Sequence, residues 1–151
     1  MVKMPEPIRY LTLHHTAGNR LVATDTASVR AYLNRVRQFH TSERMWGDIG
    51  YHFAIDPAGR VWQARSLSRQ GAHVKHHNEH NIGIVMLGNY DEQQATEIQL
   101  QSLANFFKRL ATHYRIPSSR IRSHKEWAAT ACPGRYLQTR FDALRSAGHL
   151  S

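Results

Sequence analysis

The stretch NIGIVMLGN, residues 81–89, decides the fold, and the rest of the chain can be placed around it. Residues 82–87 are an apolar run that begins after Asn81 and ends at Gly88 and Asn89. A continuous apolar run of roughly 4–8 residues between turn residues is typical of a strand that is covered on both faces of its sheet. We therefore expect residues 82–87 to form a central strand with other elements packed on both sides.

Both strands and helices are predicted around this central run. The expected strands are residues 10–13, a hairpin of 51–56 and 60–65 joined by Pro57-Ala58-Gly59, and a short strand at 121–123. The expected helices are about 26–40, 96–114 with a capping box of Thr96 and Gln99, and a last helix marked by Leu137, Phe141 and Leu144. This order predicts an α/β fold, a central mixed β-sheet flanked by helices. The 151 residues suit one domain over 1–151, with 1–8 as a short N-terminal extension.

The charge of the chain points to polyanionic partners. Lys and Arg number 20 against 11 Asp and Glu, which gives a formal net charge of +9. Such a balance suits nucleic acid, anionic lipid or an acidic cell wall, and charge alone does not choose among them. The sequence has no apolar run long enough for a membrane span, and Pro5, Glu6 and Pro7 interrupt the segment where a signal peptide would need apolar residues.

The single cysteine, Cys132, limits the chemistry of the chain. It excludes an internal disulfide and a four-cysteine zinc site, and it leaves a buried thiol, a nucleophile, or one ligand of a mixed metal site. A buried thiol is the commoner role for an isolated free cysteine, because cysteine behaves as a small hydrophobic residue. The eleven histidines of the chain make the mixed metal site worth testing.

The pattern His124-x-Glu126 followed by Cys132 has the character of a zinc site. Zinc binds imidazole nitrogen and thiolate sulfur, and a catalytic site needs three protein ligands with one position left open. His14 is the best candidate for the third ligand, because it follows the strand predicted at 10–13 and a strand end fixes its direction. His15 would point to the opposite side of the same strand.

Four blocks of the sequence resemble the zinc-dependent N-acetylmuramoyl-L-alanine amidases, which include amidase-type phage endolysins and peptidoglycan recognition proteins. The blocks are LHHTAG at 13–18, WGDIGYHF at 46–53, GAH at 71–73 together with NIGI at 81–84, and HKEWAATACPG at 124–134. They follow the order of that family and cover most of the chain. The resemblance implies the single-domain fold of these proteins, in which helices flank a central sheet.

The resemblance also implies a metal centre and a reaction. His14, His124 and Cys132 would be the ligands of one Zn²⁺ per chain, and Tyr51 would help to orient water or the scissile carbonyl. Two neutral imidazoles and one thiolate leave such a site with a net charge of +1, so that zinc can polarise a carbonyl and acidify its water. The bond cut in this family joins N-acetylmuramic acid to the L-alanine of the stem peptide.

Two positions depart from branches of the family and limit the mechanism. Many phage members carry a lysine where this chain has Thr130, whereas the catalytic recognition proteins have threonine there. Another branch places a catalytic glutamate in the central strand, where this chain has the apolar Val85. A hydroxyl can donate a hydrogen bond but cannot act as an ammonium group does. We therefore expect Tyr51 and Thr130 to hydrogen-bond the tetrahedral intermediate of amide hydrolysis.

The roles of other residues near these motifs are more open. His15 and His52 are expected to support the structure or the zinc ligands rather than to bind metal, and Glu126 would either fix the tautomer of His124 or cap a turn. The resemblance places His73 beside the substrate groove. Trp46 is a candidate for substrate binding as well, although core packing is the commoner role for a tryptophan of this kind.

The predicted function is that of a peptidoglycan hydrolase, a phage-type endolysin. The alternative is a non-hydrolytic peptidoglycan recognition domain, but such members typically lose the cysteine ligand that Cys132 provides here. A nucleic-acid deaminase is disfavoured, because those enzymes use Pro-Cys-x-x-Cys and here Pro133 follows the only cysteine.

The expected partners follow from this function. They are bacterial peptidoglycan and, through the basic surface, anionic wall polymers or lipopolysaccharide, with no specific nucleic acid. We expect a monomer that acts on the wall from the periplasm or from outside the cell. Because no signal peptide is predicted, it would reside in a host cytoplasm before lysis. The segment Arg65-Ser66-Leu67-Ser68 matches neither known pattern for the diamino acid of the stem peptide.

Overall fold

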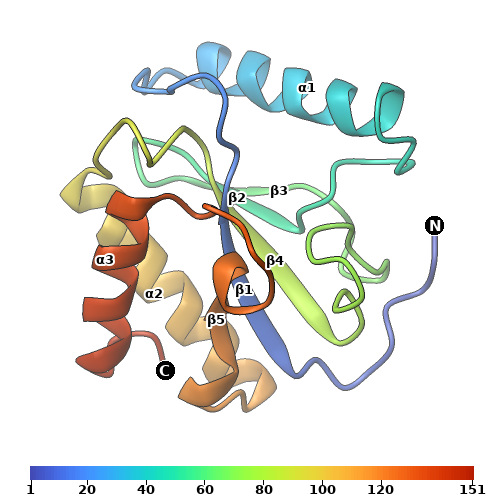
Figure 1. Cartoon of the computed structure of the whole chain (residues 1–151), viewed down its shortest axis with the longest axis vertical. Helices are drawn as coiled ribbons and strands as arrows, with labels where there is room; N and C mark the ends of the chain where they lie inside the picture. Colours follow the sequence, from blue (N-terminus) through green and yellow to red (C-terminus); the bar gives the residue numbers. More distant parts are fainter.

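The computed structural model describes residues 1–151, and its centre is a five-stranded mixed sheet with the strand order β3-β2-β4-β1-β5 (Figure 1). The strands are β1 Tyr10–His15, β2 Phe53–Ile55, β3 Val61–Gln63, β4 Asn81–Met86 and β5 Ile121–Ser123. The helices are α1 Thr26–Ser42, α2 Glu97–Tyr114 and α3 Arg135–Ser146, with short 3-10 turns η1 Ser118–Arg120 and η2 His124–Glu126. β1 is parallel to β4 and β5, β2 is parallel to β4, and only β3 is antiparallel to its neighbour. The predicted class, a mixed sheet flanked by helices, is confirmed.

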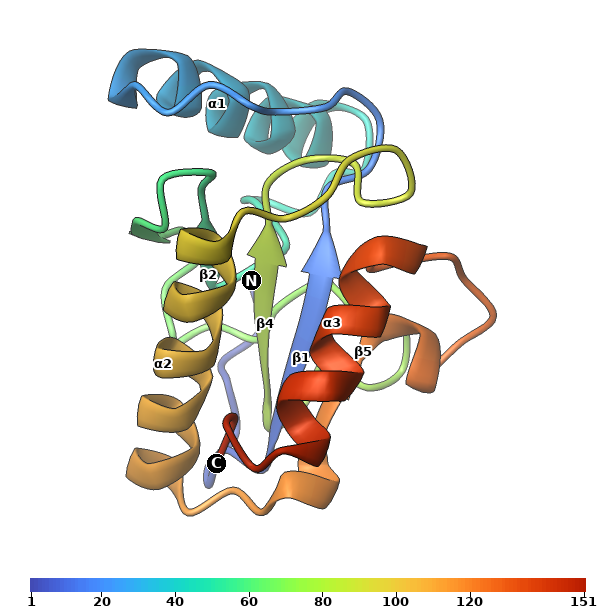
Figure 2. The same ribbon diagram turned by 90° about the vertical axis from the view of Figure 1, so that its left-hand side faces the viewer.

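Helices cover the two faces of this sheet unequally. α2 and α3 lie side by side over β4 and β1, while α1 crosses near the end to which these two strands point (Figure 2). Alternate residues of β4 divide between the two faces: Ile82, Ile84 and Met86 belong to the larger core cluster, whereas Val85 belongs to the smaller one with Val29 of α1. The continuous apolar run therefore forms a strand that is buried on both sides, as predicted.

The predicted elements occur with modest shifts at their ends. The strand predicted at 82–87 runs from Asn81 to Met86, and α1 extends to Ser42. α2 begins with the predicted capping box, in which the Thr96 side chain accepts a hydrogen bond from the backbone of Gln99. The predicted hairpin is confirmed, but its strands have only three residues each.

At the turn, β2 ends at Ile55 beside the buried Asp56 carboxylate, which organises the residues that follow. One carboxylate oxygen accepts the backbone N–H groups of Ala58 and Arg60, at 2.9 and 3.0 Å. The other accepts from the Arg60 guanidinium at 2.9 Å and from the indole N–H of Trp62 at 2.8 Å. These local bonds compete with the strand ladder and end it at Ile55.

The first eight residues pack against the rest of the chain. Met4 and Ile8 are buried members of the larger core cluster, and the N–H of Met4 donates to the carbonyl of Ser68 at 2.9 Å. The predicted extension is therefore anchored along the body of the fold. No helix of the structure has both the length and the apolar character that a membrane crossing requires.

Candidate metal centre

Three candidate ligands converge where β1 and β5 end. His14 lies near the end of β1, His124 follows β5 directly, and Cys132 lies in the loop before α3. Since β1 and β5 are parallel neighbours with Leu13 opposite Ser123, the residues that follow them leave the sheet side by side. One potential ligand atom from each of the three residues lies within 4.8 Å of the others. This is the only such group of histidine, cysteine and acidic residues in the structure.

The spacing of these atoms suits a zinc ion. Zn–S and Zn–N bonds of about 2.3 and 2.0 Å in a tetrahedral site place sulfur and nitrogen about 3.5 Å apart. The Sγ atom of Cys132 lies 3.7 Å from Nδ1 of His14. The rings of His14 and His124 have centroids 4.7 Å apart. The three side chains thus present two nitrogens and one sulfur to a common point, which is a donor set that zinc prefers.

Burial sets the protonation of the three residues. It lowers the pKa of His14 well below the ordinary histidine value and also lowers the pKa of His124, so both imidazoles are neutral at pH 7. Burial raises the pKa of the Cys132 thiol to about 12, although the backbone N–H of His15 donates to its sulfur at 3.4 Å. A nearby cation is what such a thiol needs in order to lose its proton. The two neutral imidazoles can therefore offer lone pairs to a metal ion, whereas the thiol would become a ligand only beside a cation.

His73 lies against His14. Its Nδ1 is 2.9 Å from Nε2 of His14, and its Nε2 is 3.1 Å from the carbonyl oxygen of Asn81. Only 7% of the residue is exposed, and burial lowers its pKa to about 3. The structure thus places the side chain of His73 against a candidate ligand, and its expected place beside substrate stays a prediction.

Tyr51 lies between the candidate ligand His14 and a cavity. Its ring centroid is 5.2 Å from that of His14, and it lines a cavity of about 390 Å³. The lining residues come from the loop after β1 and from α1, and they include Thr16, Tyr32, Phe39 and His40. Neither this cavity nor a larger one of about 520 Å³ between α2 and α3 is lined by His14, His124 or Cys132. The cavity beside Tyr51 is therefore linked to the candidate ligands only through the contact of Tyr51 with His14.

The two predicted catalytic hydroxyls have different surroundings. Burial raises the pKa of the Tyr51 phenol, so this group remains a neutral hydrogen-bond donor throughout the physiological range. The Thr130 oxygen accepts the backbone N–H of Cys132 at 3.2 Å, which fixes it close to a candidate ligand. The threonine hydrogen remains free to be donated, since an acceptor bond uses only a lone pair of the oxygen.

His15 contacts Cys132 through its backbone N–H, which donates to Sγ at 3.4 Å. Its ring faces the opposite side of β1 from His14, where Nδ1 accepts the N–H of Tyr90 at 3.0 Å. Glu126, in contrast, makes no hydrogen bond to His124. One of its oxygens accepts the N–H of Ser123 at 2.7 Å, and the carboxylate pairs with Arg145 at 2.8 Å. Of the two roles predicted for Glu126, the structure shows the cap.

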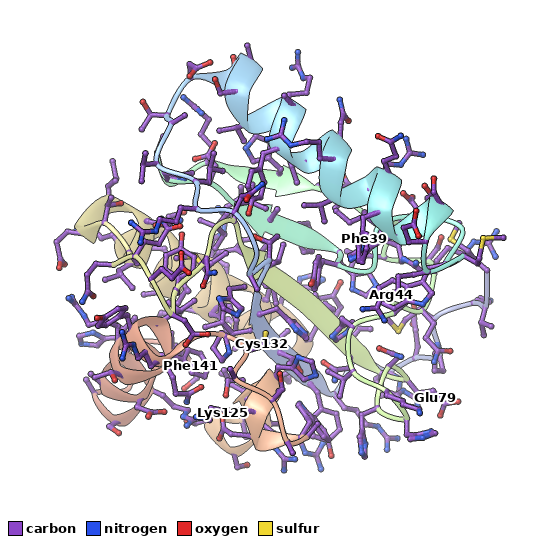
Figure 3. All side chains as sticks on the ribbon, turned by 45° about the horizontal axis from the view of Figure 1, so that its top comes forward. Phe39, Arg44, Glu79, Lys125, Cys132 and Phe141 are labelled. Atoms are coloured by element: carbon purple, nitrogen blue, oxygen red, sulfur yellow. The ribbon has the colours of Figure 1, made fainter.

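Trp46 lies near the cavity in an intermediate position. Its ring is half-buried against His40, with centroids 4.6 Å apart, and the guanidinium of Arg44 lies 5.7 Å from it. The same guanidinium lies 5.4 Å from the exposed ring of Phe39, and Figure 3 shows Phe39 and Arg44 together at the end of α1. Trp46 therefore belongs to an aromatic and cationic cluster at the cavity edge rather than to the main core.

The role of His40 is one that sequence analysis missed. It lines the cavity, and its Nδ1 accepts the N–H of Gly50 at 3.0 Å, so the neutral ring carries its proton on Nε2. The sequence placed His40 only on a helix face. The available signal was its position at the end of that face, just before the block that begins with Trp46.

Comparison with known proteins identifies one family, by a family model and by similar sequences. Residues 4–135 match the family described as N-acetylmuramoyl-L-alanine amidase. The chain is 30% identical over 147 residues to the human protein named N-acetylmuramoyl-L-alanine amidase, and this match covers 96% of the chain and 25% of the human protein. The chain thus spans about a quarter of the length of that relative.

Two solved structures extend the comparison. One is Drosophila PGRP-LB, a peptidoglycan recognition protein, with a TM-score of 0.83 and 27% identity over 99% of this chain and 86% of the other. The second is the endolysin LysCS from Clostridium intestinale, named as an N-acetylmuramoyl-L-alanine amidase. Its TM-score is 0.73 and its identity 28%, over 90% of this chain and 82% of the other.

Proposed function

Because the chain belongs to the N-acetylmuramoyl-L-alanine amidase family, we propose that it is a zinc-dependent peptidoglycan hydrolase. Its substrate would be the amide bond between N-acetylmuramic acid and the L-alanine of the stem peptide. The observation that carries this proposal is the convergence of His14, His124 and Cys132 beside a cavity that Tyr51 lines.

The three converging side chains would hold one Zn²⁺ and leave it with a net charge of +1. When bound, zinc supplies a Lewis acid that polarises the scissile carbonyl and lowers the pKa of water. The phenol of Tyr51 would donate a hydrogen bond to the oxygen that becomes negative as the amide is attacked. Thr130, held beside Cys132, would donate a second hydrogen bond to the tetrahedral intermediate. Both donors are neutral, so neither adds charge to the ground state.

A non-hydrolytic recognition domain is the second candidate. The similarity to PGRP-LB supports recognition of peptidoglycan, which both candidates require, and the cavity at the end of α1 offers a place for it. Hydrolysis is favoured because the third ligand, Cys132, is present and its sulfur faces Nδ1 of His14. The similarity to LysCS supports the more specific proposal of a phage-type endolysin that acts on the bacterial wall. The net charge of +9 supports attraction to anionic wall polymers or lipopolysaccharide.

The test is digestion of purified peptidoglycan, followed by mass spectrometry of the products and by labelling of new amino termini. We expect free L-alanine amino termini with the wild-type protein and none after chelation, with recovery when zinc is added back. Lys125→Gln is a matched control, because this exposed residue is next to His124 and outside the ligand set. Binding of peptidoglycan without release of L-alanine termini would exclude the hydrolase and leave the recognition domain.

A further inference from the structure

The hydrogen bonds behind His14 determine which of its two nitrogens can bind a metal ion. A backbone carbonyl only accepts hydrogen bonds, so the contact between the Asn81 oxygen and Nε2 of His73 requires the proton of His73 on Nε2. A neutral imidazole has one N–H group, and Nδ1 of His73 is therefore an acceptor. Its partner at 2.9 Å, Nε2 of His14, must then be the donor.

This chain of donors leaves Nδ1 of His14 with a free lone pair. Nδ1 is also the atom that faces Sγ of Cys132 at 3.7 Å. We propose that His73 is a positioning residue that fixes the metal-binding tautomer of His14. This inference rests on the proposed zinc centre and assigns to a buried side chain a task at that centre.

The fold provides a fitted slot for the ring of His73. A Cβ atom at Gly83 of β4 would lie 2.6 Å from Cγ of His73, and one at Gly71 would lie 2.5 Å from its Cδ2. Neither glycine can therefore carry a side chain without moving the ring. The side chain of Asn78 accepts the backbone N–H of His73 at 2.9 Å, which anchors the residue from the other side.

The Asn81 carbonyl, which accepts the last hydrogen bond of this series, is also held in place. Asn81 is the first residue of β4, and its side chain accepts from Thr12 at 2.9 Å and donates to the carbonyl of His77 at 2.8 Å. The Asn81 carbonyl therefore has a fixed direction. Histidine ligands of metals commonly donate their second N–H to a carboxylate, a carbonyl or water. Here the acceptor is a neutral imidazole, which selects the tautomer without adding negative charge to the centre.

The first test needs no metal and no substrate. Long-range ¹H–¹⁵N NMR of the metal-free protein, labelled at histidine nitrogens, reports the tautomer of each ring. We expect His14 and His73 both in the form with hydrogen on Nε2. A His14 ring that carries its hydrogen on Nδ1 would overturn the inference whatever the amidase assay shows.

Two variants separate tautomer control from simple packing. His73→Asn keeps an oxygen acceptor close to the position of Nδ1, whereas His73→Leu keeps a similar volume but removes the acceptor. By competition with a chromophoric chelator, we expect His73→Leu to weaken zinc binding by about 10- to 100-fold and His73→Asn to restore most of the loss. The thermal stability of both metal-free variants is measured in parallel.

The outcomes distinguish this inference from the proposed function. Wild-type zinc affinity in a folded His73→Leu protein overturns the role of His73 and leaves the hydrolase untouched. Equal losses of affinity in both variants, in step with equal losses of metal-free stability, mean that the residue only packs, and this also overturns the inference. Tight zinc binding by the wild type without amide hydrolysis refutes the proposed function while the tautomer result still stands.

Discussion

The sulfur of Cys132 lies between the backbone N–H of His15 and Nδ1 of His14. We expect Cys132→Ser to lose zinc binding and to lower amidase activity by about 100-fold or more, because a serine hydroxyl is a poor zinc ligand. Cys132→Asp is the matched variant, since a carboxylate can bind zinc, and it should retain part of the affinity. Bound zinc is measured by metal analysis after dialysis. Full zinc content in Cys132→Ser would contradict the assignment.

Tyr51 is predicted to act on the reaction rather than on the metal. We expect Tyr51→Phe to lower kcat by about 100- to 1,000-fold with zinc affinity unchanged, because it removes one donor to the developing oxyanion. Thr130→Val should lower kcat by about 10-fold through loss of the second donor, and it also removes the acceptor for the N–H of Cys132. Tyr114→Phe, at the end of α2, is the control. Near-full kcat in both site variants with zinc bound would show that neither hydroxyl takes part.

The sequence allowed the convergence of His14, His124 and Cys132 to be predicted because these residues follow identifiable strand ends and a recognisable loop pattern. The contact between His73 and His14 could not be predicted in the same way. It depends on the direction of a backbone carbonyl and on the space above Gly83, and neither leaves a signal in residue spacing. The same holds for His40, whose ring reaches the cavity only because α1 crosses the end of the sheet.

At the scale of the element, the apolar strand β4 contains a glycine, Gly83, that leaves space for the ring of His73. We expect Gly83→Ala to lower the free energy of unfolding by about 1–3 kcal/mol, because the added methyl group overlaps the ring of His73. Urea denaturation of the metal-free protein measures the loss. The control is a double-mutant cycle with His73→Ala, which removes the ring. In that background, Gly83→Ala should destabilise the protein much less. Equal costs in both backgrounds would mean that the ring of His73 does not explain the glycine.

The elements themselves were largely predictable from local sequence. The apolar run of β4 and the capping box of α2 each contain their own signal, within a few residues of chain. The turn end of the hairpin has no such local signal. It depends on the Asp56 carboxylate, which accepts the N–H groups of Ala58 and Arg60. Strand order was also beyond local signals, since it depends on which strands pair across the whole chain.

At the scale of the whole molecule, buried histidines make stability depend on pH. Burial lowers the pKa of His40 and of His52 to about 4, from an ordinary value of 6.5. Between these pH values the unfolded chain binds more protons than the folded chain, so the free energy of unfolding rises with pH. The contribution of each ring is fully present above about pH 6.5. We expect the metal-free protein to lose at most about 3 kcal/mol for each of these rings as the pH falls from 7 to about 4, and less where solvent screens the ring.

The measurement is urea denaturation at a series of pH values in the presence of a chelator. His52→Asn is the matched variant, because it keeps an acceptor for the N–H of Gly83 that His52 now binds at 3.1 Å. Its stability should fall less steeply between pH 6.5 and 4. A profile for the wild type that stays flat from pH 7 to 4.5 would contradict the prediction.

The net charge of +9 also belongs to the molecule as a whole. We expect binding to anionic wall preparations to weaken by about 10-fold or more between 50 and 500 mM salt, because the Debye length falls from about 14 Å to about 4 Å. Cosedimentation measures the bound fraction, and the catalytically impaired Tyr51→Phe protein avoids degradation of the wall. Binding that is independent of ionic strength would show that the basic surface has no part in it.

The position of β1 in the sheet has a consequence for how the protein matures during synthesis. β1 is made before both of its neighbours, β4 and β5, which lie at residues 81–86 and 121–123. A ribosome that adds about 5–20 residues per second therefore releases the first strand several seconds before its partners exist. His14 meets Cys132, 118 positions later, only after this cysteine has been made. A nascent chain that ends before this cysteine therefore lacks one of the three candidate ligands.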